Sequence, residues 1–244
     1  MKLVVDIGNT FSKLAIFKNR DLIALHTTPE LSVEHIRDLF RATPNIKSAI
    51  VSAVRQYDQN INNELKSKIR LFVLNPQTRL PFRVLYKTPK TLGNDRIGAV
   101  AGAQDLFPGK NILVIDTGTC ITYDMVTAAS QYLGGAISPG IQMRLKSLNT
   151  FTGNLPLIQP DFDKNIDLIG DSTENSILSG VQNAVIMEVD ATIHEYKNRF
   201  DDLKIIVTGG DNKYFDRTLK NNIFAAPNLV LSGLNKILDF NESN

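Results

Sequence analysis

The feature that most constrains the fold is a strand-and-turn pattern that occurs twice in the chain. Residues 3–9 read LVVDIGN and residues 113–119 read LVIDTGT. Each copy is an apolar run followed by Asp, one further residue and Gly. Polar turn residues and then a second apolar run follow each copy. Because an internal repeat sets the architecture of a chain, we expect two copies of one strand–turn–strand unit.

Strands alternate with helices in the rest of the sequence. Apolar residues at helical spacing follow Ser32 and predict a capped helix over 32–41. Further helices are expected at 60–69, 95–107, 143–148, 172–199 and 229–240, and strands at 22–27, 49–54, 71–74, 82–86 and 203–208. This alternation predicts an α/β fold with two halves, residues 1–108 and 109–244.

Composition excludes several classes of protein. The 244 residues are 43% hydrophobic and carry a net charge of +2, which is ordinary for a globular chain and too mild for a nucleic-acid surface. A single cysteine, Cys120, excludes an internal disulfide, and three scattered histidines argue against a zinc site. No apolar run approaches the roughly 18 residues of a membrane helix, and the N-terminus has no signal-peptide pattern. We therefore expect a cytoplasmic protein without nucleic-acid or membrane partners.

The two Asp-x-Gly turns predict a site for a phosphate and a cation. Gly8 and Gly118 let the backbone approach an anion closely, and successive N–H groups there can bind it. Asp6 and Asp116 end the two strands and supply the carboxylate oxygens that hard cations prefer. The alternative is that each Asp only caps its own turn, but two matching copies favour a functional site.

The commoner phosphate and hydrolase motifs are absent. Residues 102–110 lack the spacing of a P-loop, and Asn111 follows Lys110 where Ser or Thr is needed. No strand leads into G-x-G-x-x-G, and there is no G-x-S-x-G elbow. The phosphate chemistry therefore belongs to another class of fold.

Six short motifs in order resemble those of type III pantothenate kinases, a branch of the actin, sugar-kinase and Hsp70 superfamily. They are DIGNT at 6–10 with Lys13, GNDR at 93–96, DTGT at 116–119, GGAISPG at 134–140, DST at 171–173 and TGG at 208–210. The resemblance spans almost the whole chain. It implies a duplicated actin-like (ribonuclease H-like) ATPase fold with a nucleotide cleft between two halves.

The resemblance also implies an activity, which is ATP-dependent phosphorylation of pantothenate to 4′-phosphopantothenate, the first step of coenzyme A biosynthesis. It implies a homodimer that uses Mg²⁺ and a monovalent cation, K⁺ or NH₄⁺. By position, the first phosphate loop consists of Asp6, Ile7, Gly8, Asn9, Thr10, Phe11, Ser12 and Lys13, with Thr119 as a further ATP contact. Pantothenate contacts fall on Tyr86, Gly93, Asn94, Asp95, Arg96 and Thr173, with Thr173 reaching the pocket of the second subunit. Asp116 matches the monovalent-cation ligand, and Asp6 is expected to hold Mg²⁺ directly or through water.

The chemistry of Asp95 and Arg96 agrees with these roles. Phosphoryl transfer is mostly positioning and charge stabilisation, with one residue placed to accept the proton of the nucleophile. At the start of a helix, Asp95 could take the hydroxyl proton as general base while Arg96 holds a substrate carboxylate. The alternative is a helix-start Asp favoured by the dipole, beside a solvated Arg. Two residues depart from the family pattern, Asn94 and Cys120, where the family commonly has alanine.

Two other functions stay open. The chain could be a kinase for another small hydroxylated metabolite, because fold analogy alone does not fix a substrate. It could also be a nucleotide-binding regulatory or accessory protein without kinase turnover. Asp95 discriminates against the latter, since a protein that only binds needs no general base.

Overall fold

The computed structural model describes residues 1–243 and divides the chain into two compact units. Of the described residues, the first unit comprises 1–109, 129–133 and 228–243, and the second 110–128 and 134–227. The sequence predicted that each half would be one continuous segment of the chain. The first unit of the structure instead combines the N-terminal segment with the last helix. None of the helices in residues 1–243 combines the length and apolar character needed to cross a bilayer.

The first unit is built on a five-stranded sheet in the order β3-β2-β1-β4-β5. Its strands are β1 (Lys2–Ile7), β2 (Ser12–Lys18), β3 (Asp21–Thr28), β4 (Ser48–Ala53) and β5 (Arg70–Val73). β1, β2 and β3 form an antiparallel meander, and β4 and β5 run parallel to β1. The helices of this unit are α1 (Val33–Ala42), α2 (Asn60–Lys68), α3 (Asn94–Leu106) and α8 (Leu229–Glu242).

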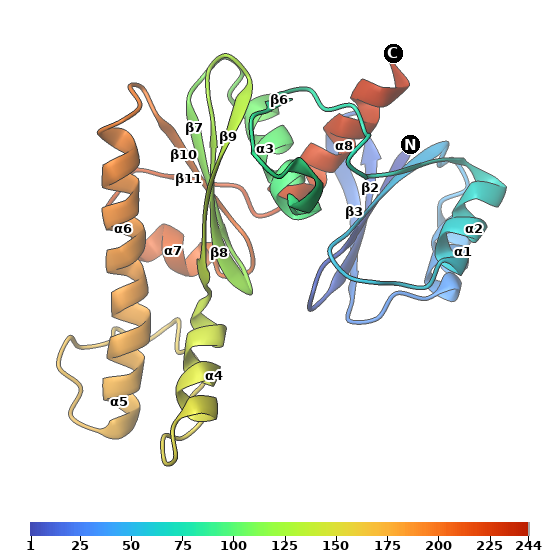
Figure 1. The fold of residues 1–244 in the computed structure, drawn as a ribbon. Helices are drawn as coiled ribbons and strands as arrows, with labels where there is room; N and C mark the ends of the chain where they lie inside the picture. The colour runs from blue at the N-terminus through green and yellow to red at the C-terminus, as the bar shows by residue number, and fades with distance from the viewer. Residues whose placement is uncertain (244) are drawn as a thin grey trace. The chain divides into compact units, whose positions relative to one another are not determined.

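Helices cover both faces of this sheet (Figure 1). Leu3, Val5 and Ile7 of β1 share a core with side chains of α1 and α2. Because side chains alternate along a strand, Val4 and Asp6 lie on the opposite face, where α3 and α8 pack against β4 and β1. The first unit therefore brings Asp6, at the end of β1, onto the face that carries α3.

The α3–α8 pair explains why the last helix belongs to the first unit. A side chain at Gly233 of α8 would meet the backbone of α3 at Gly98 and Gly102, so glycine is required for this close approach. Asn235 adds a 2.8 Å hydrogen bond from its amide to the carbonyl of Asn19, which follows β2. The expected closely packed helix over 95–107 is thus confirmed.

The second sheet repeats the strand order of the first. Its strands are β6 (Arg83–Val84), β7 (Ile112–Thr117), β8 (Cys120–Val126), β9 (Gln131–Pro139), β10 (Lys204–Thr208) and β11 (Phe224–Ala225). They lie in the order β11-β10-β7-β8-β9-β6, in which β9-β8-β7-β10-β11 corresponds to β3-β2-β1-β4-β5. β6 pairs with residues 131–132, which are counted with the first unit. The internal duplication expected from the sequence is present in the fold.

Helices of the second unit pack on its sheet. They are α4 (Ile141–Phe151), α5 (Thr173–Leu178), α6 (Ala184–Lys197) and α7 (Asn212–Thr218). Val185, Val189 and Ile193 of α6 share a core with Leu113 and Ile115 of β7. A π-helical segment, Ser179–Asn183, joins α5 to α6, so the long helix predicted over 172–199 is continuous but not uniform.

The sequence prediction differs from the structure in three segments. The expected strand over 82–86 shortens to β6, and α7 and β11 were not predicted. Residues 134–139 of the motif GGAISPG belong to β9. The glycines there serve packing, because a side chain at Gly135 would run into the Tyr123 carbonyl of β8.

Candidate functional site

Strand register groups three polar side chains at the carboxyl end of β1. Asp6 pairs with Lys13 of antiparallel β2 and with Ser52 of parallel β4. Neighbours directly across a sheet share a face, so all three side chains lie together. The Ser52 hydroxyl donates a 3.3 Å hydrogen bond to Asp6 Oδ1. Sequence analysis missed Ser52, which lies in an otherwise apolar predicted strand.

The Asp6 carboxyl is an unusual acid. Burial raises its pKa to about 6, although the Lys13 ammonium and the Ser52 hydrogen bond lower it and the Asp95 charge raises it further. Asp95 is therefore close enough for its charge to act on the Asp6 carboxyl. At neutral pH, Asp6 therefore holds a poorly solvated negative charge that a bound cation would stabilise.

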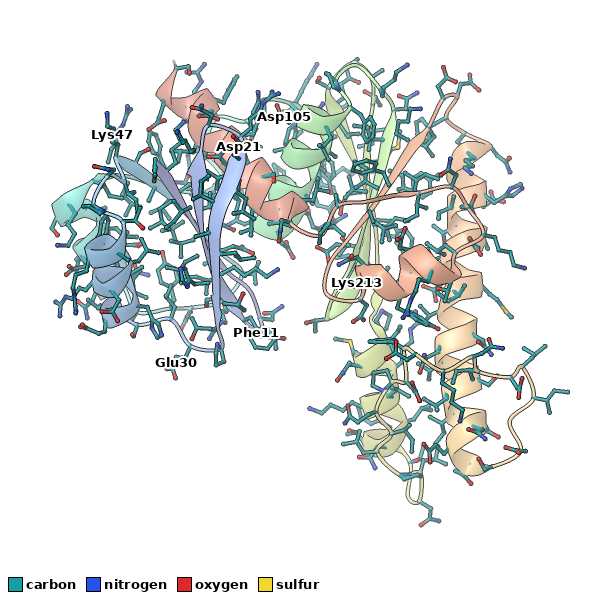
Figure 2. The ribbon with its side chains drawn as sticks, turned by 180° about the vertical axis from the view of Figure 1, so that it is seen from behind. Phe11, Asp21, Glu30, Lys47, Asp105 and Lys213 are labelled. Atoms are coloured by element: carbon teal, nitrogen blue, oxygen red, sulfur yellow. The ribbon has the colours of Figure 1, made fainter. Side chains whose placement is uncertain are left out.

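The turn between β1 and β2 holds the predicted phosphate loop. The Gly8 N–H donates a 3.0 Å hydrogen bond to the Phe11 carbonyl, and Phe11 lies exposed at this edge of the sheet (Figure 2). The side chains of Ile7 and Ser12 are buried, so any contact they make with a nucleotide runs through the main chain. Asn9 and Thr10 are exposed.

An arginine that sequence analysis missed braces this turn. Arg55 follows β4, and its Nε–H donates to the Gly8 carbonyl at 2.9 Å. A terminal nitrogen of the same guanidinium donates to the Pro29 carbonyl at 3.2 Å. Arg55 thereby connects the β1–β2 turn to the segment after β3. No sequence motif marks it, because its partners are main-chain carbonyls.

The start of α3 carries the predicted substrate residues. Asp95 Oδ1 accepts a 2.9 Å hydrogen bond from the Arg96 N–H. The buried Arg96 guanidinium lies 5.9 Å from the ring centroid of Tyr86, which makes a cation–π contact. Tyr86 in turn lies 6.1 Å from Tyr132, ring to ring. The structure therefore brings Tyr86, Asp95 and Arg96 into one neighbourhood.

The second unit repeats the arrangement around Asp116. Asp116 pairs with Thr122 of β8 and with Thr208 of β10, which are the positions that Lys13 and Ser52 take around Asp6. The Thr117 hydroxyl donates a 2.8 Å hydrogen bond to the Thr208 carbonyl and ties the strand ends together. The repeat thus extends to the polar ends of the strands.

Gly209 leaves room for the Asp116 carboxylate. Its φ of +98° is one that side-chain-bearing residues rarely adopt, and a Cβ there would lie 2.6 Å from Asp116 Oδ1. Two residues later, the Asp211 N–H donates a 2.9 Å hydrogen bond to the Thr117 carbonyl. Burial raises the pKa of the Asp211 carboxyl to about 6. Sequence analysis stopped at Gly210 and missed this second perturbed acid.

Thr119 and Thr173 also lie in the second unit. Thr119 is exposed in the turn after β7, and its carbonyl accepts a 3.1 Å hydrogen bond from the Gly140 N–H. Thr173 is the first residue of α5, whose N-cap is Ser172. It lines a surface cavity with Leu148, Leu155, Ser176, Ile177 and Gly180.

The carboxylates of the site decide whether it suits the divalent cation that the resemblance implies. Within residues 1–243, no three His, Cys, Asp or Glu side chains gather as a ready-made metal site. Mg²⁺ does not need one, because it keeps several waters and binds through one or two carboxylates plus substrate phosphates. A single partly buried carboxylate beside a turn that is predicted to bind phosphate, as at Asp6, fits that mode.

Comparison with known proteins decides the family. A family model described as type III pantothenate kinase matches residues 2–195. A type III pantothenate kinase of Christiangramia forsetii is 49% identical over 244 residues, and the alignment covers all of both chains. The chain belongs to the type III pantothenate kinase family.

Solved structures confirm the fold class of this family member. A Campylobacter jejuni protein assigned to the Baf family of transcriptional activators is 22% identical, with a TM-score of 0.64 over 99% of this chain and 100% of its own. A ROK family glucokinase from Streptomyces griseus, solved with glucose and AMPPNP, is 12% identical, with a TM-score of 0.54 over 100% of this chain and 99% of its own. The duplicated actin-like α/β fold expected from the sequence is therefore confirmed.

Proposed function

We propose that this chain transfers the γ-phosphoryl group of ATP to the primary hydroxyl of pantothenate, which gives 4′-phosphopantothenate in the first step of coenzyme A biosynthesis. Family membership supports the reaction, and one structural observation supports the site. Asp6, Lys13 and Ser52 meet at the carboxyl end of β1, on the face of the sheet that carries the start of α3 and Asp95. Ligands of open α/β sheets bind at such strand ends.

Asp95 is proposed as the general base. Its carboxylate takes the proton of the pantothenate hydroxyl as that oxygen forms its bond to the γ-phosphorus and the bond to the departing ADP oxygen breaks. Arg96 is proposed to hold the pantothenate carboxylate, with the Tyr86 ring fixing the guanidinium plane. Gly93 and Thr173 complete the proposed contacts.

The β1–β2 turn and Lys13 are proposed to hold the ATP phosphates. Main-chain N–H groups of the turn, at residues 9–11, can point at the phosphate oxygens, and the Lys13 ammonium adds a positive charge. Asp6 would hold a divalent cation, directly or through water. When bound, that cation neutralises charge on the phosphates.

The second unit is proposed to supply two further contacts. Asp116 is the proposed ligand of K⁺ or NH₄⁺, and Thr119 the proposed ATP contact. The repeat supports this assignment, since Asp116 takes the position in its sheet that Asp6 takes in the first.

A homodimer is proposed in which Thr173 reaches the pocket of the second subunit. Large apolar side chains lie exposed on the second unit near α5, which is typical of surfaces that bind another protein; they are Phe151, Leu157, Leu168, Ile169 and Met187. Sedimentation measures the assembly. A monomer with full activity contradicts this part of the proposal.

The experiment for the function is ATP consumption with and without pantothenate, in K⁺ and Mg²⁺. Pantothenate-dependent consumption, with the phosphorylated product identified by mass, supports the proposal. ATP that binds without any turnover favours a regulatory protein. Turnover with another hydroxylated acceptor and none with pantothenate refutes the substrate.

A further inference from the structure

The side chain of Asn94 bonds main-chain carbonyls of the protein itself, which a residue that only binds substrate does not need to do. Asn94 is the first residue of α3, between Gly93 and Asp95. Its side-chain Nδ2 donates to the Ala53 carbonyl at 3.2 Å and to the Leu74 carbonyl at 3.4 Å. Ala53 ends β4, and Leu74 directly follows β5. One amide group thus joins the helix to two neighbouring strands.

The two Asn94 bonds form at the point where the pairing of β4 and β5 ends. The paired residues of β4 and β5 end at Val51 and Val73, and a last 2.8 Å bond runs from the Leu74 N–H to the Val51 carbonyl. Beyond that point the two strands no longer pair. An amide nitrogen carries two N–H donors, which suits it to bond one carbonyl from each strand.

These bonds matter because the N-cap of α3 has no side chain with which to fix the first turn. That N-cap is Gly93, which makes no capping hydrogen bond through a side chain. Within the first turn, the Arg96 N–H is bonded to the Asp95 carboxylate of the same turn, whereas the Asn94 amide bonds main-chain groups outside the helix. The tie from Asn94 therefore sets where the first turn of α3 sits against the carboxyl ends of the strands.

That turn carries the proposed base. Asp95 follows Asn94 directly, and its charge acts on Asp6 at the end of β1. β1 is hydrogen-bonded to β4, where Ser52 holds Asp6 one residue before the Ala53 carbonyl that Asn94 binds. Asn94 and Asp6 are thus fixed to the same strand end.

We propose that Asn94 is a positioning residue, and that its two bonds to β4 and β5 hold Asp95 at its working distance from the phosphate side of the site. This inference rests on the proposed function. It replaces the ligand role expected for Asn94 from the family resemblance. A displacement of about 1 Å in a reacting group can lower a rate by about 100-fold, so release of the first turn should act on kcat.

The test compares Asn94→Ala and Asn94→Asp with Asn235→Ala. Asn94→Asp keeps the shape but loses both donors and sets a carboxylate against two carbonyl oxygens. Asn235→Ala is the matched control, because it removes an amide-to-carbonyl bond in the same unit, near Asn19 at the opposite edge of the same sheet. Steady-state kinetics give kcat and KM for both substrates, and thermal unfolding gives stability.

We expect kcat to fall about 10-fold or more in both Asn94 variants, with KM for pantothenate within about twofold of wild type. Asn235→Ala should lower the melting temperature and leave kcat unchanged. A higher KM for pantothenate at unchanged kcat shows a ligand and overturns the proposal. Equal losses of kcat in Asn94→Ala and Asn235→Ala show general destabilisation and overturn it too.

A second readout needs no turnover. Asn94→Ala releases the first turn of α3 from β4 and β5, so amide hydrogen exchange in that turn, at Asp95 and Arg96, should become faster, whereas Asn235→Ala should leave it unchanged. Exchange at these amides that is as slow in Asn94→Ala as in the wild type overturns the positioning role. Absence of turnover in the wild type, with the exchange result as expected, refutes only the proposed function.

Discussion

Replacing Asp6 with asparagine should stabilise the protein at neutral and alkaline pH while it abolishes the proposed metal contact. Burial raises the pKa of Asp6 from 3.8 to about 6 in the folded chain. A difference of about 2 between folded and unfolded pKa values corresponds to about 3 kcal/mol between the charged and the neutral form. The pKa of about 6 already contains the effects of Lys13 and Ser52, so about 3 kcal/mol is the net cost expected for the partly buried charge.

The sign follows from proton linkage. The folded pKa is raised, so the folded chain binds the proton more tightly than the unfolded chain. The stability that Asp6 contributes is complete below about pH 4 and is lost as the pH rises through about 6. The substituted asparagine carries no charge at any pH. The advantage of Asp6→Asn over wild type should therefore grow by about 2 kcal/mol between about pH 4.5 and about pH 8.

Urea unfolding followed by circular dichroism, without nucleotide or divalent cation, measures this difference. Asp21→Asn is the control, because Asp21 is exposed on β3 of the same sheet (Figure 2) and its replacement should change stability by less than about 0.5 kcal/mol. The reasoning is refuted if Asp6→Asn is no more stable than wild type at about pH 8, or if its advantage does not change with pH.

Three further perturbations test the rest of the site. Lys13→Gln should raise KM for ATP about tenfold or more, because a charge-assisted contact to phosphate is lost. Steady-state kinetics measure this, and an unchanged KM for ATP would remove Lys13 from the site. Gly209→Ala should destabilise the chain by about 1–3 kcal/mol and weaken activation by K⁺, because the added Cβ meets the Asp116 carboxylate. Thermal unfolding measures the stability and a K⁺ titration measures the activation. A normal response to K⁺ would contradict the link between Gly209 and Asp116. Replacing K⁺ and NH₄⁺ with Na⁺ should lower activity sharply, and equal initial rates in the three salts would withdraw the monovalent-cation role of Asp116.

Local signals in the sequence predicted much of the fold. The Ser32 cap of α1 forms as expected, with His35 closing the capping box, because its partners lie within one helical turn. The repeated strand–turn–strand pattern predicted the duplicated sheets, since both copies keep the same strands and the same terminal Asp.

Contacts that depend on strand register could not be predicted in this way. Ser52 meets Asp6 only because β4 lies beside β1 with one particular offset, and the two residues are 46 positions apart in the chain. Arg55 binds main-chain carbonyls, which leave no pattern in the sequence. Asn94 lies inside a recognised motif, but which way its amide points depends on where β4 and β5 stop pairing.

Pantothenate-dependent ATP turnover by Asp95→Asn tests the central claim most directly. Asp105→Asn is the matched control, because Asp105 lies near the other end of α3, where it pairs with Arg20 and Lys236 (Figure 2). General-base catalysis typically contributes about 100- to 10,000-fold, so kcat should fall by at least about 100-fold in Asp95→Asn and stay near wild type in Asp105→Asn. Pantothenate phosphorylation at an undiminished rate in Asp95→Asn would contradict the assignment of the base at the start of α3.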